Sequence, residues 1–191
     1  MRWTFSLTVV PVIVLSLFTI VGRAAGLPGI APETVTDYIH AVIEADRTFY
    51  TIHVVERSQQ QGGAPAAENW RTQKKALPLP AQFLAEASDL ASKTGTKVRY
   101  RLISLWPINP QNGPDDESEK KGLDAVREHP EQTATSTVTI GNQTYFRAIY
   151  ADRAVSQACA GCHNTHPRSP KKDFKVGDVM GALVIEIPLG K

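Results

Sequence analysis

The sequence predicts an α+β fold, in which an antiparallel sheet has a long N-terminal helix and further helices packed to one side. Two observations predict it. Between residues 32 and 95 the apolar residues recur at helical spacing, and after Gly95 the spacing changes to strict alternation. Beyond that point the chain reads as short strands, two of them joined by a hairpin. No internal repeat is present, so we expect one domain over residues 27–191, after a leader of residues 1–26.

The leader has the pattern of an export signal. Residues 5–21 form an uncharged apolar run, with Arg2 before it and Arg23 after it. As a helix this run would span about 26 Å at ~1.5 Å per residue, slightly less than the ~30 Å hydrocarbon core, and Pro11 weakens it further. We therefore expect a cleaved signal peptide, with an uncleaved membrane anchor as the alternative. Either way the domain would work in the periplasm or on the outer face of the cytoplasmic membrane.

The charge balance and cysteine count exclude two classes of protein. The chain has 21 Lys and Arg against 19 Asp and Glu, and Arg2 and Arg23, which account for the excess, lie in the leader. Bulk charge therefore gives no reason to expect nucleic-acid binding. Two cysteines are too few for a disulfide-stapled scaffold or a four-cysteine zinc site, so they must act as one pair.

Two helices come first in the domain. After a linker at residues 27–32, Pro32 and Glu33 suit the first turn of a long helix that we expect to run to Gly62. Residues 62–80 have little periodicity and predict a loop. A second helix is expected from Pro80 to residue 91, ended by Gly95.

Strands follow the second helix. Residues 98–106 alternate as a strand, and the prolines after them predict a loop. We expect the acidic run at 115–119 to be a solvated surface, with a short helix at 123–128. Residues 135–140 and 144–152 predict a hairpin, in which Gly141 supplies the positive φ of the turn. The last strand is expected at residues 179–187.

The motif Cys159-Ala160-Gly161-Cys162-His163 is the attachment motif of a c-type haem. Two thiols three residues apart on one helical turn can each add to one haem vinyl group. The next residue is then carried beneath the iron, where its imidazole becomes an axial ligand. The sequence therefore predicts one haem c, anchored by Cys159 and Cys162 and ligated by His163.

Two cysteines at this spacing have three other possible roles in proteins. A disulfide between Cys159 and Cys162 would close almost no loop and stabilise little. A thioredoxin-like redox pair belongs in a βαβ unit, which the neighbouring sequence does not predict. Zinc bound by both cysteines with His163 and His166 is chemically compatible, but adjacent residues rarely reach one tetrahedral ion together. Haem attachment also agrees with export.

Residues 100–116, YRLISLWPINPQNGPDD, and 151–189, around the motif, closely resemble a bacterial c-type haem family with a PAS-like domain, often found at the sensory end of histidine kinases and chemoreceptors. The resemblance implies an antiparallel PAS-like sheet and one haem held by the motif, with the opposite ligand on the long N-terminal helix. It implies haem binding rather than a settled reaction. Because the chain ends at Lys191, a sensor of this kind would act through a separate partner.

The expected sixth ligand is His53. His40 and His53 share the long helix, but thirteen residues at about 100° each place them about 220° apart, so only one can face the domain. His53 follows Phe49 and Tyr50 by one turn, which favours it over His40. Met180 is the rival ligand, with packing in a strand as its simpler role. The remaining histidines, His129 and His166, are weaker candidates.

Aromatic, aliphatic and cationic residues are expected around the haem. Trp106 lies in the presumed pocket, and Arg147 and Arg153 are the expected partners of the haem propionates, because Arg153 lies just before the motif. Core packing is an equally good account of Trp106 and of the other expected haem neighbours, Ile108, Tyr145 and Ile149.

The function that these residues indicate is a periplasmic monohaem cytochrome c, serving in electron transfer or redox response and not as an enzyme. Its partner would be a redox protein or a membrane electron-transfer complex. The alternative is a haem-based gas or redox sensor that acts through a separate protein. A peroxidase-type enzyme would need a vacant iron site and a distal acid-base residue.

Overall fold

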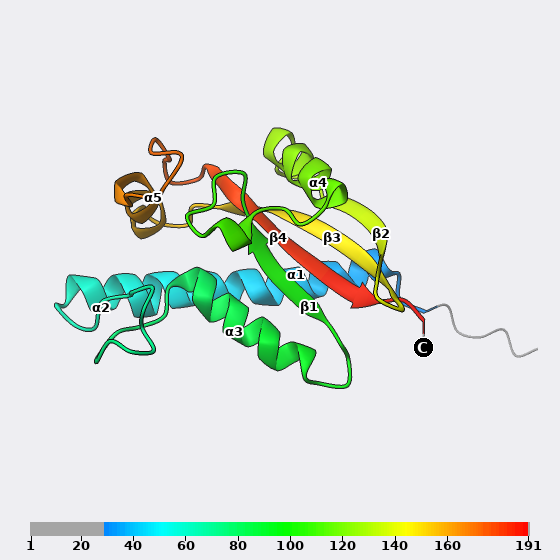
Figure 1. Ribbon diagram of the computed structural model, residues 1–191, viewed down its shortest axis with the longest axis horizontal. Helices are drawn as coiled ribbons and strands as arrows, with labels where there is room; N and C mark the ends of the chain where they lie inside the picture. The colour runs from blue at the N-terminus through cyan, green and yellow to red at the C-terminus, as the bar shows by residue number, and fades with distance from the viewer. Residues whose placement is uncertain (1–28, 191) are drawn as a thin grey trace, which may run out of the picture.

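The computed structural model describes residues 29–190 (Figure 1), so the predictions for the leader lie outside the described residues. None of the helices in this range is long and apolar enough to cross a membrane. The helical elements are α1 (Pro32–Phe49), a π-helical segment (Tyr50–Glu56), α2 (Arg57–Gln60), α3 (Pro80–Ser92), a 3-10 turn (Pro110–Asn112), α4 (Glu117–Glu128) and α5 (Gln157–Thr165). The strands are β1 (Arg99–Ile103), β2 (Ala134–Ile140), β3 (Gln143–Arg153) and β4 (Val179–Pro188).

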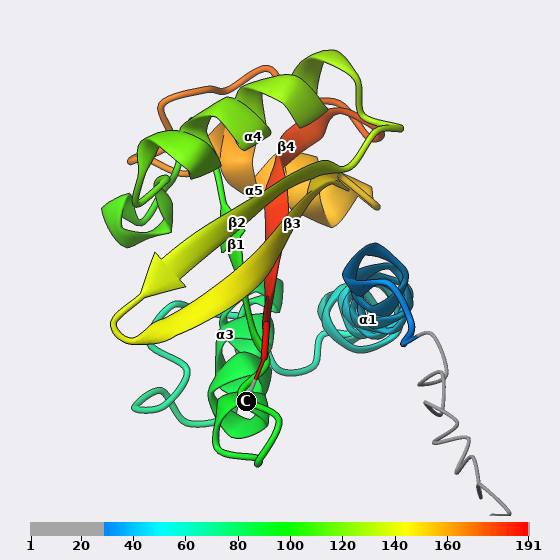
Figure 2. The same ribbon diagram turned by 90° about the vertical axis from the view of Figure 1, so that its right-hand side faces the viewer.

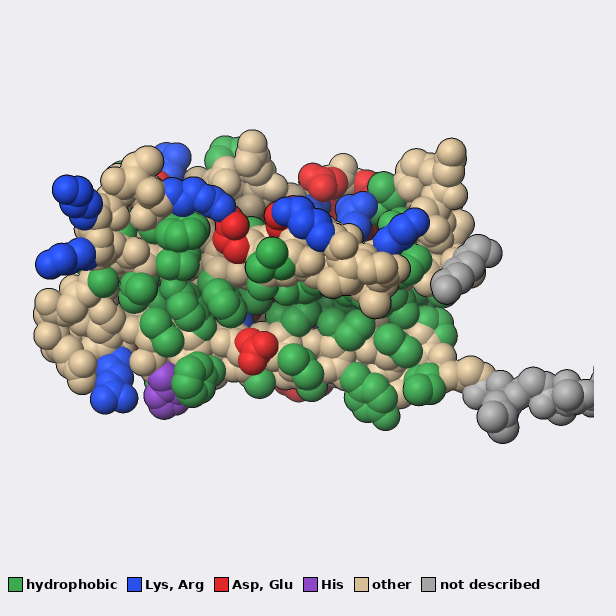
Figure 3. Space-filling view, turned by 90° about the horizontal axis from the view of Figure 1, so that it is seen from below, with side chains coloured by type: hydrophobic (Ala, Val, Ile, Leu, Met, Phe, Trp, Pro, Cys, Tyr) green, Lys and Arg blue, Asp and Glu red, His purple; other side chains and the backbone are tan. Residues whose placement is uncertain are grey.

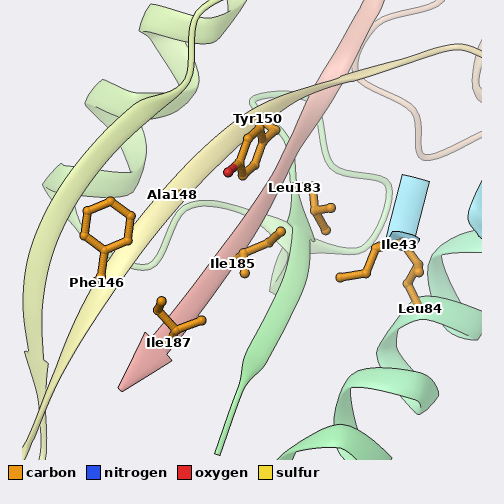
Figure 4. Packing of buried hydrophobic residues seen from close by; sticks show 8 residues of the cluster. All are labelled: Ile43, Leu84, Phe146, Ala148, Tyr150, Leu183, Ile185 and Ile187. Atoms are coloured by element: carbon orange, nitrogen blue, oxygen red, sulfur yellow. The ribbon is translucent and has the colours of Figure 1, made fainter. Parts of the chain in front are cut away.

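The four strands form one antiparallel sheet in the order β1-β4-β3-β2, which confirms the α+β prediction. The expectation that all helices pack to one side is wrong. Figure 2 shows α1 and α3 beside one face and α4 over the other. On the first face Ile43 of α1 and Leu84 of α3 pack on Leu183 and Ile185 (Figure 4). On the second face Leu123, with its neighbour Val126, packs on strand residues Ile103, Ile149 and Val184.

The long helix runs as predicted, from Pro32 to Gln60 through α1, the π segment and α2. The π segment was not predicted, because periodicity cannot register a local change to i→i+5 hydrogen bonding. Such segments are rare and often occur at functional sites. The second helix and the hairpin are confirmed, and Gly141 has the positive φ of 60° that a two-residue turn with Gly in its first position requires.

The first strand is shorter than predicted. β1 ends at Ile103 because the next residue, Ser104, does not continue the backbone pairing with β4. The Ser104 N–H donates to Asn112 O at 2.8 Å, and the Ser104 hydroxyl donates to Met180 O at 2.7 Å. A glycine is required opposite this point, since a Cβ on Gly181 would lie 2.2 Å from Ile103 O.

The acidic run at 115–119 is not simply a solvated surface, and the helix after it is longer than predicted. Asp116 caps α4 by accepting the Glu119 N–H at 2.8 Å. The helical turn then carries the Glu119 side chain inward, where it is 2% exposed and pairs with Arg101. Arg147 joins the same cluster, contacting Asp116 at 2.8 Å and Glu186 of β4 at 2.8 Å. These ion pairs hold α4 on the sheet.

The pH dependence of stability should report the Asp116 pair. Partial burial acts to raise the pKa of Asp116, but the hydrogen bonds from Arg147 and from the Glu119 N–H outweigh it, so this pKa lies below its ordinary value. A depressed carboxyl pKa gives stability that is present above the unfolded-state pKa and is lost as pH falls through the folded-state value. Asp116→Asn retains a good helix cap and removes the charge.

Urea unfolding measured between about pH 7 and pH 3 should therefore show a smaller acid-induced loss of stability in Asp116→Asn than in the wild type. Burial and the Asp116 charge both raise the pKa of Glu119, so the difference between the two profiles reports the Asp116 charge together with its effect on Glu119. Parallel pH profiles for the two proteins would contradict the assignment.

Candidate functional site

The predicted attachment motif lies on one short helix. Cys159, Cys162 and His163 all fall within α5, which begins after Ser156. Its Ala160 is fully buried in a small core with Phe174 and Met180. Cys159 is half-buried against this core and Cys162 is exposed, and both are free thiols. The helix therefore presents two thiols and an imidazole within two turns.

A side-chain clamp fixes α5 against the segment that follows it. The Asn164 side chain donates to Phe174 O at 2.8 Å and accepts the Phe174 N–H at 2.9 Å. The Phe174 ring meets the ring of His163 edge-on at 5.9 Å, and meets Trp106 edge-on at 5.8 Å. Asn164 and Phe174 were missed from the sequence, where nothing distinguishes them from ordinary loop residues.

His163 has a burial and a protonation state that suit a metal ligand. Its ring is half-buried, and its Nδ1 atom is buried with no hydrogen-bond partner among the described residues. Burial lowers the pKa of His163, and the nearby charges of His166 and Arg47 lower it further. The imidazole is therefore neutral at pH 7, which is the form that binds metals.

The cysteines do not have the properties of an activated redox pair. Although Cys162 is exposed as a residue, desolvation at its thiol raises its pKa, and Cys159 and Glu68 act in the same direction. Reactive cysteines of redox disulfides instead have a lowered pKa, produced by cations or a helix N-terminus. Among the described residues no group of three or more His, Cys, Asp and Glu side chains could hold a metal ion.

The loop between α2 and α3 reaches the site through Glu68. Arg168 donates to both carboxylate oxygens of Glu68, at 2.6 and 2.7 Å, and His166 Nε2 lies 3.6 Å from the same carboxylate. Figure 1 shows α5 at the same end of the molecule as α2 and this loop. The site is therefore bordered by α5, by the segment after it and by the loop that contains Glu68.

Arg47 is a site neighbour that the sequence did not identify. It lies on the inner face of α1, is 8% exposed, and pairs with Asp152 of β3 at 2.6 Å. Its Nε atom is buried and has no hydrogen-bond partner within residues 29–190. Arg47 lies one turn from Ile43 and from Thr51, two other inward residues, and that spacing is the signal that could have placed it.

The prediction that His53 faces the domain and His40 faces away from it is wrong. The ring of His40 stacks on Tyr150 of β3, with centroids 3.9 Å apart and planes 6° apart, while His53 is exposed and packs only on Phe49 at 5.0 Å. Phe49 is itself 62% exposed. The aromatic neighbour therefore marked the outer face of the helix. Ligation by His53 stays a prediction, without the geometric support first given to it.

Both arginines that were expected to bind the haem propionates contact other groups of the protein. Arg147 is held by Asp116, Glu119 and Glu186, and it precedes Arg153 by six residues on β3, about 20 Å at ~3.3 Å per residue. Arg153 is exposed and donates to Gly177 O and to Glu131. Arg147 is therefore committed to buried acids, whereas Arg153 is held by an exposed pair and stays a predicted propionate partner.

Two other expected residues do lie beside α5. Trp106 packs against the small core that contains Ala160, and Met180 is 5% exposed within that core. Lys171 lies over both rings, 5.5 Å from the centroid of Trp106 and 4.9 Å from that of Phe174. Lys171 is therefore the cation that the structure brings to this side of the site.

Comparison with known proteins gives one family. A family model described as Tll0287-like (Tll0287) matches residues 31–188, from the start of α1 to the end of β4. No curated protein matches the chain. The match includes every described element that borders the site.

Proposed function

The chain belongs to the Tll0287-like family, and we propose that it is a c-type cytochrome with one haem attached through Cys159 and Cys162 and ligated by His163. The observation that carries the proposal is the α5 helix. It presents two free thiols three residues apart, followed directly by a half-buried histidine whose pKa is lowered by burial.

The residues around α5 fit this cofactor. Thioether bonds from the two thiols would fix the ring beside the helix, and His163 would supply the proximal nitrogen. Phe174 and Trp106 give the site an apolar wall, and Lys171, which also pairs with the exposed Asp173, offers a cation for a propionate. When bound, haem supplies a reversible one-electron couple.

We further propose electron transfer or redox response, in the periplasm or on the outer face of the cytoplasmic membrane, with a redox protein or a membrane electron-transfer complex as partner. The apolar run at residues 5–21 supports export. The proposal includes no bond-making reaction, so the protein would not be an enzyme.

Acid–acetone extraction of the purified, exported protein tests the covalent attachment. We expect the colour to remain with the polypeptide, because thioether bonds survive acid denaturation. Cys159→Ser/Cys162→Ser should release its haem under the same treatment. Extraction of all haem from the wild type would refute the proposal.

A haem-based gas sensor is the second candidate, and the outward position of His53 favours it. With His53 exposed and His40 stacked on Tyr150, neither histidine of the long helix is directed at His163. An iron without a strong sixth ligand binds diatomic gases readily. This function predicts that the ferrous wild type binds carbon monoxide at once and that His53→Ala leaves the spectrum unchanged.

Electron transfer through a closed haem predicts the opposite result. The ferrous wild type would then be low-spin and slow to bind carbon monoxide, and removal of the sixth ligand would open it. Absorption spectra of the wild type, His53→Ala, His40→Ala and Met180→Ala, each with and without carbon monoxide, distinguish the two functions. They also identify the ligand, since only the variant that lacks it should gain rapid binding.

A further inference from the structure

The outward face of α1 is apolar. Tyr38, Val42 and Phe49 are 65%, 62% and 62% exposed, and Ala45 between them is also exposed. Their spacing of four, three and four residues puts all four on one stripe of the helix, opposite the buried Ile43 and its neighbours. We call these four residues the α1 stripe. Its spacing is that of a coiled-coil seam.

The outer face of α4 does not share this property. The exposed positions of α4 are charged except for Ala125: Glu117, Lys120, Lys121, Arg127 and Glu128. A helix that faces water normally has this charged outer surface, and one that is apolar on both faces is normally buried on both. In Figure 3 apolar side chains are spread along the long helix in the lower part of the view, while most Lys and Arg side chains lie over the upper part.

We infer that the α1 stripe is the contact between two copies of this chain, paired with their α1 helices antiparallel. The stripe is self-complementary in that arrangement. If Val42 of one copy faces Ala45 of the other, Tyr38 faces Phe49, so large residues meet at both ends and small residues in the middle. Two-fold symmetry repeats each contact, as in most homodimers.

The charges along the long helix set the antiparallel orientation. Its first half exposes four acids, Glu33, Asp37, Glu44 and Asp46, and no exposed cation, because Arg47 is buried. Its second half exposes His53 and Arg57. In this antiparallel register Glu33 and Asp37 of each copy lie opposite the second half of the other helix, which exposes the cation Arg57, and the helix dipoles are opposed. Parallel pairing would place acid beside acid.

A membrane surface is a poorer occupant of the stripe. Helices that lie on membranes carry Lys and Arg on their polar face to reach anionic lipids. Between residues 29 and 56 the only Lys or Arg is the buried Arg47, so α1 has no exposed Lys or Arg with which to contact anionic lipid. A contact limited to one helix per copy is small for a protein interface, so the dimer is weak and reversible, with a Kd of roughly 1–100 µM.

Sedimentation of the full holoprotein over a range of concentrations tests the dimer. The wild type should change from monomer to dimer as the concentration rises. Val42→Glu should weaken association at least about tenfold, because it puts like charges near the two-fold axis. Leu90→Glu is the matched control, since Leu90 is 67% exposed on α3, away from the stripe. It should leave association unchanged.

A second variant guards against a simple folding defect. Ala45→Arg should give the same loss of dimer as Val42→Glu, with the helical circular dichroism of the wild type. A wild type that stays monomeric, or a dimer that both variants leave intact, overturns the inference. So does a monomer that instead sediments with vesicles of phosphatidylcholine and phosphatidylglycerol. None of these outcomes depends on the haem.

A charge swap tests the orientation. Tyr38→Lys and Phe49→Glu should each weaken the dimer, and the double variant should recover part of the loss, because antiparallel pairing sets each new lysine against a new glutamate. In a parallel pair the same double variant would oppose lysine to lysine and glutamate to glutamate. Association weaker in the double variant than in either single variant would therefore overturn the antiparallel arrangement.

Discussion

Replacing Arg147 with methionine should lower the free energy of unfolding by about 3 kcal/mol, the low end of the usual cost of breaking a buried ion pair. The cost is at the low end because Glu119 keeps its pair with Arg101 and Glu186 keeps its pair with Arg99. Arg147 is 3% exposed and contacts Asp116, Glu119 and Glu186. Glu119 is 2% exposed and Glu186 is 5% exposed, so neither carboxylate can turn to water when the guanidinium is removed. The measurement is equilibrium unfolding in urea at pH 7.

The matched control is Arg153→Met on the same strand. Arg153 is exposed and pairs with the exposed Glu131, so its removal should cost no more than about 1 kcal/mol. Equal effects of the two substitutions would contradict the role given to the buried cluster. A rise in the stability of Arg147→Met as pH is lowered would support it, because protonation relieves the excess negative charge of the cluster.

His163→Ala should abolish the low-spin haem spectrum even where the ring stays attached to the two cysteines. In the proposed cytochrome His163 is the proximal ligand, and removing it leaves a weak ligand or water in its place. Absorption spectra of the ferric and ferrous variant measure the change. His166→Ala is the control, because His166 follows α5 and contacts Glu68 rather than the core that contains Ala160. It should retain the wild-type spectrum, and an unchanged His163→Ala spectrum would rule out His163 as the ligand.

Elements with a strong local pattern could be predicted from the sequence. The long helix, the second helix, the hairpin and the last strand each have a clear period and a turn or cap residue at their ends, and the structure places them within a few residues of the predicted bounds. Local spacing also placed Cys159, Cys162 and His163 on one helix.

Features that depend on tertiary contacts could not be predicted. Glu119 looked like part of a solvated acidic run, and only the position of α4 over Arg101 and Arg147 makes it a buried partner. Arg147 was expected at the haem because cations suit propionates, but strand pairing puts it opposite Glu186. A cation in a sequence does not reveal which of several acids will hold it.

The predicted orientation of the long helix was wrong for a related reason. An aromatic residue beside His53 was taken as a sign of burial, whereas Phe49 belongs to the exposed α1 stripe. When a helix has two apolar faces, the sequence pattern does not show which of them packs on the sheet. The same property that misdirected the choice of His53 is the basis for the inferred dimer.

Intact mass spectrometry of the purified protein, denatured before analysis, tests the proposed haem attachment most directly. We expect a mass that exceeds that of the polypeptide by one haem, and fragmentation that assigns the addition to the peptide containing Cys159 and Cys162. A polypeptide without the added mass, with both thiols free or joined as a disulfide, would contradict the account.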